Sequence, residues 1–126
     1  MGCRQRRWPT KQKSDASPFL GSQVPRILFV KECPYLEQMT ACGAEVISLG
    51  RRHDLAAARR QYPHLVFQGN VDEKILRTGT PGQVAEATRR CRAAGGGQRH
   101  IINLNHGVDR TTPLANFEAY VRAAKE

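Results

Sequence analysis

Several common features are missing from this sequence of 126 residues. No stretch approaches the roughly 18 consecutive apolar residues of a membrane-spanning helix, which excludes a transmembrane protein. The four cysteines form no Cys-x-x-Cys pair, so neither a zinc knuckle nor a thioredoxin-like motif is available. No apolar secretory segment follows the N-terminus. We therefore expect reduced thiols in a cytoplasmic protein.

Acidic residues are also few, since 11 Asp and Glu stand against 20 Lys and Arg, which gives a net charge of +9. This excess favours anionic partners in general: nucleic acid, acidic lipid, or a small polycarboxylate or phosphate. Charge alone does not choose among them. The chain has neither a known nucleic-acid reader motif nor an aromatic platform, however. We therefore expect no nucleic-acid partner and no membrane partner.

The charge is concentrated at the start of the chain, where basic residues mix with Pro, Ser and Gly and show no periodicity. This pattern is typical of disorder. We expect a basic, disordered leader at residues 1–23 and one folded domain at residues 24–126.

Within residues 24–126, short apolar runs alternate with helical patterns. The runs predict strands at 26–30, 45–49, 64–68 and 100–104. Helices are expected at about 34–42, 55–60, 80–94 and 112–124, with 69–79 as a long connection. This alternation predicts parallel strands joined by right-handed helical crossovers. Two architectures satisfy it: an open doubly wound sheet, or half of a (β/α)₈ barrel, since a complete barrel needs about 250 residues.

The two longer helices each show a predicted apolar face. Thr80-Pro81-Gly82-Gln83 has the residues of a capping box with proline in the first turn. The expected buried faces are Val84, Ala87, Cys91 and Ala94 on the first helix, and Leu114, Phe117, Val121 and Ala124 on the second. Cys91 is therefore interpreted as a core residue.

Function is expected at the carboxyl ends of the strands in either architecture. His106 directly follows the last strand and can exchange a proton near neutral pH, although a structural role is an equal alternative. The Gln68-Gly69-Asn70 turn follows the third strand, and glycine there would let the backbone approach a ligand. An ordinary turn is the alternative. No two histidines have the spacing of metal ligands on one helix face, so no metal is expected.

The segments HLVFQGNVDEKIL and HIINLNHGVDRTTPLANFEAYV resemble the carboxyl-terminal part of the uroporphyrinogen decarboxylase family. In that family a Gln-Gly-Asn-[Leu/Val]-Asp segment follows the seventh barrel strand, and Asn-Leu-x-His-Gly follows the eighth. A Thr-Pro-x-x-Asn helix start comes soon after. The resemblance covers about residues 24–126. It implies an α/β fold that is the C-terminal half, four βα units with parallel strands, of a TIM (β/α)₈ barrel.

The family converts uroporphyrinogen III to coproporphyrinogen III in heme biosynthesis, without metal or organic cofactor. The resemblance matches the family's active-site histidine to His106 and implies a tetrapyrrole polycarboxylate as substrate. We expect Gln68, Gly69, Asn70 and Arg51 to bind that substrate, Arg51 from its position at a strand end. The family's aspartate, arginines, tyrosine and serine lie in the half that precedes residue 24. The resemblance therefore implies a truncated lyase that is inactive alone.

The sequence leaves two alternatives open. Corrinoid or thiol methyltransferases of the same superfamily bind zinc through a His-x-Cys segment after a barrel strand, and residues 29–33 hold no such pair. A non-enzymatic basic fragment is the other alternative. Half a barrel leaves two edge strands unpaired, so we expect a homodimer or a complementing N-terminal half as partner.

Overall fold

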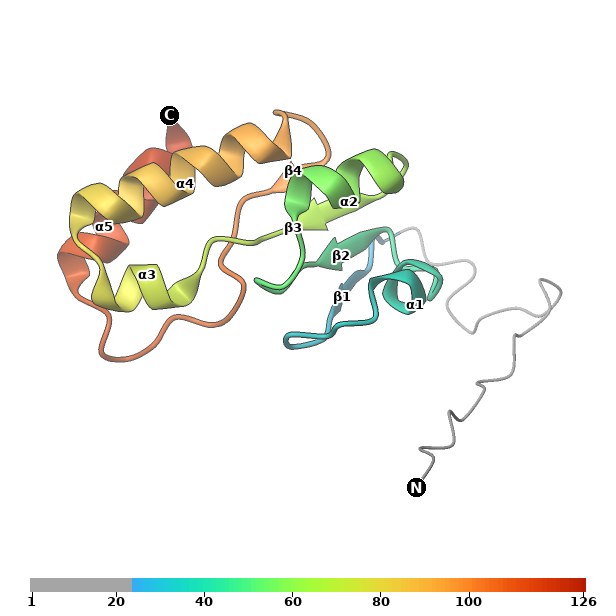
Figure 1. Cartoon of the computed structure of the whole chain (residues 1–126), viewed down its shortest axis with the longest axis horizontal. Coiled ribbons are helices and arrows are strands. Elements are labelled where there is room, and N and C mark those ends of the chain that lie inside the picture. Colours follow the sequence, from blue (N-terminus) through green and yellow to red (C-terminus); the bar gives the residue numbers. More distant parts are fainter. Residues whose placement is uncertain (1–23) are drawn as a thin grey trace, which may run out of the picture.

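The computed structural model describes residues 24–126, so the leader expected at 1–23 lies outside the described residues. The elements follow in the order β1 (Ile27–Phe29), α1 (Leu36–Thr40), β2 (Val46–Ser48), α2 (Leu55–Gln61), β3 (Val66–Gln68), α3 (Glu73–Thr78), α4 (Pro81–Gly95), β4 (His100–Ile101) and α5 (Leu114–Lys125). In Figure 1, α3, α4 and α5 lie toward one end of the molecule, and β1 and α1 toward the other. None of the helices described is both long and apolar enough to span a bilayer.

The four strands form one sheet in the order β1-β2-β3-β4, and every neighbouring pair is parallel. The predicted topology of four adjacent parallel strands is therefore confirmed. Four consecutive strand–helix units of this kind are the architecture of part of a (β/α)₈ barrel.

The strands are shorter than predicted, most of all β4, which ends at Ile101 instead of residue 104. The ladder with β3 is interrupted because Gly69 adopts a φ of +118°, which is outside the extended range. Pairing resumes beyond it through a parallel bridge between Val71 and Leu104.

One face of the sheet packs under the helices. Leu28, Ile47 and Phe67 lie side by side in register, and Ile47 and Phe67 are fully buried in the core. The next row belongs to the other face and holds Phe29, Ser48, Gln68 and Ile101. In a closed barrel, the face away from the helices is the barrel interior.

Helix α4 begins as the sequence predicts. The Thr80 hydroxyl accepts a hydrogen bond from the Gln83 backbone N–H at 3.2 Å, and the Gln83 side chain accepts one from the Thr80 N–H at 2.9 Å. Val84 and Cys91 are buried, so the apolar face predicted for this helix is confirmed.

The sequence analysis was wrong about residues 69–79, which contain helix α3. Asp72 caps this helix, since its carboxylate accepts a hydrogen bond from the Lys74 N–H at 3.0 Å. Leu76 is fully buried and fixes the helix to the core. Two adjacent apolar residues, Ile75 and Leu76, in a helix of six give too little periodicity to predict it.

The predicted face of α5 is also wrong. Leu114 is 70% exposed and Phe117 is 39% exposed, whereas Asn116 and Ala123 are buried. The helix is turned this way because Asn116 Nδ2 donates hydrogen bonds to the carbonyl oxygens of Leu76 at 2.9 Å and Gly79 at 2.8 Å. These two carbonyls belong to the last turn of α3 and to its C-cap residue, where helical acceptors lack partners within the helix.

Candidate active site

A hydrogen-bond network joins the first, second and fourth strand ends. Asn105 follows β4 and donates from Nδ2 to Glu32 Oε1, beyond β1, at 3.0 Å. The same oxygen accepts the backbone N–H of Arg51, beyond β2, at 3.2 Å. Asn105 Oδ1 also accepts the N–H of Glu73 at the start of α3, at 2.8 Å. One buried amide therefore holds three strand-end loops together.

Asn70 adds the third strand end to this arrangement. Its Nδ2 donates to the carbonyl oxygens of Gly50 at 3.1 Å and His53 at 2.7 Å. Both donor hydrogens of the amide are thus used to hold the loop after β2. The structure gives Asn70 a positioning role for the loop that carries Arg51.

Gly69 has a clear packing reason for being glycine. The position that a Cβ would occupy lies 3.0 Å from the Leu49 carbonyl oxygen, and Gly69 is buried. Its own carbonyl oxygen accepts hydrogen bonds from the His100 ring and from the Cys91 thiol. Its neighbour Gln68 lies on the interior face of the sheet and donates to Ser48 Oγ at 3.4 Å.

His106 lies directly after Asn105 and is half-buried. Its Nδ1 lies 3.3 Å from the Gly107 carbonyl oxygen, which is a local contact. Arg51 is exposed on the neighbouring loop. The side chains of His106 and Arg51 are therefore on loops joined through Glu32, without a direct bond between them.

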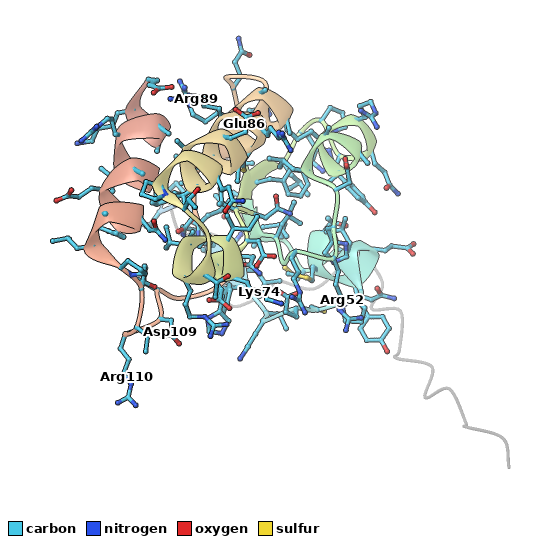
Figure 2. All side chains as sticks on the ribbon, turned by 60° about the vertical axis from the view of Figure 1, so that its left-hand side comes forward. Arg52, Lys74, Glu86, Arg89, Asp109 and Arg110 are labelled. Atoms are coloured by element: carbon cyan, nitrogen blue, oxygen red, sulfur yellow. The ribbon has the colours of Figure 1, made fainter. Side chains whose placement is uncertain are left out.

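Exposed cations occur after every strand of the sheet. The loops and helix starts at the carboxyl ends carry Lys31, Arg51, Arg52, Lys74 and Arg110, all exposed. Figure 2 shows the labelled Arg52, Lys74 and Arg110 along one edge of the molecule, and Arg89 at the opposite edge. The strand-end edge can therefore attract a multiply charged anion.

Two residues at the centre of the network, Glu32 and Asn105, were not given a role in the sequence analysis. Glu32 lies over Gly50, where a Cβ would come within 3.0 Å of Glu32 Oε2, and this oxygen is buried without a partner among the described residues. A polar residue after each strand was the only available signal. It could not show that residues 73 positions apart would meet.

Among residues 24–126, His, Cys, Asp and Glu side chains do not gather in groups of three that could hold a metal ion. His53 lies on the same loop as Arg51, and its Nε2 forms a hydrogen bond with the Cys33 carbonyl oxygen at 2.6 Å. This contact requires a proton on Nε2, so the ring acts there as a structural donor.

Comparison with known proteins gives matches to one family. Residues 8–126 match the family model of uroporphyrinogen decarboxylase. The uroporphyrinogen decarboxylase of Synechococcus sp. (strain JA-3-3Ab) is 35% identical over 105 residues, which are 82% of this chain and 29% of the relative. That of Synechococcus sp. (strain CC9605) is 37% identical over 103 residues, 80% of this chain and 29% of the relative. That of Coxiella burnetii (strain Dugway 5J108-111) is 32% identical over 107 residues, which are 83% of this chain and 30% of the relative.

The chain thus spans under a third of the length of these curated relatives. The match nevertheless covers most of its own residues, including all four strands and the network that joins their ends. The chain belongs to the uroporphyrinogen decarboxylase family.

Proposed function

We propose that this chain forms one side of a tetrapyrrole-binding site in a uroporphyrinogen decarboxylase-type lyase. Its ligand would be the polycarboxylate uroporphyrinogen, and the reaction would convert uroporphyrinogen III to coproporphyrinogen III. The observation that carries this proposal is the set of exposed cations after all four strands, the last of which His106 also follows. A ligand with eight carboxylates fits such an edge because each cation can pair with a different carboxylate.

His106 would be the catalytic residue that this chain supplies. Decarboxylation replaces each carbon dioxide by a proton, so the site needs a group that exchanges protons near neutral pH. Family resemblance matches this residue to the active-site histidine. Asn105, held by Glu32, would position the loop from which the imidazole reaches the substrate.

Gln68, Asn70 and Arg51 would contribute to substrate binding in different ways. Gln68 lies on the interior face, and the exposed Arg51 can reach a carboxylate. Asn70 would act by holding the Arg51 loop through its two carbonyl contacts, with Gly69 allowing the tight packing beneath.

The isolated chain would bind the ligand without turning it over. Decarboxylation by protonation creates a pyrrole cation, which needs a preorganised anion for stabilisation. The family's aspartate for that role has no counterpart in the matched motifs. Loss of one preorganised group commonly costs about 10²–10³ in rate.

Binding and turnover can be tested separately. Uroporphyrin, the oxidised ring with the same eight carboxylates, is titrated by fluorescence against the wild-type chain, Arg51→Gln with Arg52→Gln, and Arg89→Gln. We expect the double variant at the strand end, Arg51→Gln with Arg52→Gln, to raise the Kd for uroporphyrin by about tenfold, which corresponds to about 1.4 kcal/mol. Arg89→Gln should leave this Kd nearly unchanged. Equal effects of the two changes would contradict a localised site.

Turnover is measured by carbon dioxide release from uroporphyrinogen, for the chain alone and with a separately produced first half of a family barrel. We expect no release from the chain alone and activity in the mixture that His106→Asn lowers. Robust turnover by the isolated chain would overturn this assignment of roles.

A further inference from the structure

A continuous chain of hydrogen bonds crosses the carboxyl end of the sheet, and Glu32 lies at its centre. Asn70, after β3, donates to the Gly50 carbonyl oxygen at 3.1 Å. The N–H of the same peptide unit, which belongs to Arg51, donates to Glu32 Oε1 at 3.2 Å. Asn105, after β4, donates to that oxygen from Nδ2 at 3.0 Å. The loops after all four strands are therefore joined through one carboxylate.

Arg51 and His106 lie at different places along this chain of bonds. Arg51 is part of it, and His106 directly follows Asn105. The two side chains have no direct bond, and the bonded route between their loops passes through Glu32. A contiguous network of this kind couples two sites when one of its elements has two arrangements that both sites bias.

The two oxygens of the Glu32 carboxylate are used unequally. Oε1 accepts both donors, whereas Oε2 is buried and has no hydrogen-bond partner among residues 24–126. A carboxylate can accept about four hydrogen bonds, and a buried oxygen that accepts none costs free energy. The donors and the carboxylate would therefore be better satisfied if each donor had an oxygen of its own.

Oε2 lies directly beside the peptide unit that Oε1 holds. Gly50 is buried, and a Cβ built on it would be 3.0 Å from Glu32 Oε2 and 3.1 Å from Glu32 Cδ. Because Gly50 has no side chain, the carboxylate packs against its backbone, next to the Arg51 N–H. A small tilt of the peptide unit between residues 50 and 51 would move this N–H from Oε1 to Oε2.

The backbone of Glu32 is held in place by its surroundings. Its φ is +47°, in the left-handed region that few residues other than glycine adopt. The turn is closed by a hydrogen bond from the Cys33 N–H to the Val30 carbonyl oxygen at 3.3 Å, and the His53 ring binds the Cys33 carbonyl oxygen. Residues held in such conformations cluster at functional sites. Since the turn is fixed, what can change is the oxygen that each donor uses.

We propose that Glu32 is a positioning residue that couples ligand binding at Arg51 to the placement of His106. In the free chain both donors share Oε1. A ligand carboxylate that pairs with Arg51 tilts the peptide unit, and the Arg51 N–H moves to Oε2. Asn105 then has Oε1 to itself, and the loop that carries His106 becomes more ordered. This coupling rests on the proposed function, because its ligand is the same polycarboxylate.

Glu32→Gln separates this role from a purely structural one. Glutamine has nearly the same size and keeps one acceptor oxygen, so it can still hold Arg51 and Asn105, but its NH₂ group cannot accept the Arg51 N–H. Glu32→Ala removes both oxygens. The matched control is Glu37→Gln, which removes the same charge at an exposed position of α1.

The first measurement needs no ligand and follows the Arg51 amide proton of the full chain by NMR. Asn105→Ala leaves Oε1 to the Arg51 N–H alone, so we expect this proton to move downfield, as it does in a stronger hydrogen bond. In a chain that also carries Glu32→Ala, the change at Asn105 should leave the Arg51 signal nearly unchanged. Equal changes of the Arg51 signal with and without Glu32 would overturn the route through this residue.

The second measurement is amide hydrogen exchange at residues 105–107, without ligand and with saturating uroporphyrin. We expect uroporphyrin to slow this exchange by about fivefold or more in the wild type and Glu37→Gln, which is the lower end of typical coupling between sites. In Glu32→Gln we expect less than about half of that effect. Equal slowing in Glu32→Gln would mean that the ligand covers these residues directly, and would overturn the coupling alone. Failure of the wild type to bind uroporphyrin would instead overturn the proposed function and the ligand-driven step together.

Discussion

Asn105 Nδ2 donates a hydrogen bond to Glu32 Oε1 at 3.0 Å, although the two residues follow β4 and β1 at opposite edges of the sheet. In a flat sheet, three strand spacings would separate these edges by about 14 Å. An asparagine and a glutamate cannot span that distance with a single hydrogen bond. Both residues lie on loops beyond the strands, and these loops therefore converge at the carboxyl end of the sheet, as the strand-end loops of a barrel do.

This bond should contribute measurably to stability. Asn105→Ala removes the acceptor of the Glu73 N–H and one of the two donors to Glu32 Oε1, which keeps the Arg51 N–H. We therefore expect the free energy of unfolding to fall by about 1–3 kcal/mol. Asn103→Ala is the matched control, since its side chain accepts only a local bond from Leu104 N–H. Urea unfolding followed by circular dichroism measures both. Equal losses of unfolding free energy in the two variants would show that the bond between Asn105 and Glu32 stabilises the fold no more than a local hydrogen bond does.

Asn116 offers a second test, on the contact between α5 and α3. Asn116→Ala removes the donor that satisfies the Leu76 and Gly79 carbonyls in a buried place. We expect a loss of about 1–3 kcal/mol in the free energy of unfolding. Glu118→Ala, at an exposed position of the same helix, should change it by less than about 0.5 kcal/mol. A stable Asn116→Ala variant would mean that α5 is held by its apolar contacts alone.

The pH dependence of stability should reveal the ion pair between Arg26 and Glu45. The hydrogen bonds from Arg26 lower the pKa of Glu45 from 4.5 to about 2. A lowered pKa in the folded state means that the stabilisation is present above pH 4.5 and is lost as the pH falls through 2. The Tm difference between wild type and Glu45→Gln should thus shrink as the pH drops across this range. A constant difference would exclude the linkage.

Some features of the fold could be predicted because local sequence determines them. The capping box at Thr80 and the apolar spacing of Val84 and Cys91 act within a few residues, and both are confirmed. Strand order followed from the strand–helix alternation. The face of α5 could not be predicted, because Asn116 is buried only when the free carbonyls at the end of α3 lie beside it.

Some features of the candidate site could likewise be predicted from local sequence, and others depend on tertiary packing. Position at a strand end could be predicted for His106, Arg51 and Asn70 from the pattern alone. The bonds of Glu32 and Asn105 depend on how the loops beyond β1, β2 and β4 converge, which is a property of the packed whole. The packing role of Gly69 against Leu49 likewise depends on the distance between two strands.

Cys91 links the turn at Gly69 and Asn70 to helix α4, and its reactivity should reflect this. Its thiol donates to the Gly69 carbonyl oxygen and accepts the Asn70 N–H, both at 3.3 Å. Burial raises the pKa of the thiol, and the Asn70 bond offsets only part of this effect. At pH 8 we expect Cys91 to react with maleimide on the order of a hundredfold more slowly than the exposed Cys42, and equally fast in urea.

The raised pKa of Cys91 also has a consequence for stability at alkaline pH. The folded state holds the thiol proton more tightly than the unfolded chain, so this stabilisation is complete below about pH 8.5, the usual thiol pKa. It is lost as the pH rises through the higher pKa of the folded state. We expect the Tm of the wild type to fall more steeply above pH 9 than that of Cys91→Ala, measured by thermal scans between pH 7 and 10.5. If the two proteins gave parallel curves of Tm against pH and maleimide labelled Cys91 rapidly, the thiol would not be buried against the Gln68-Gly69-Asn70 turn. Solvent would then reach the turn from the side of helix α4.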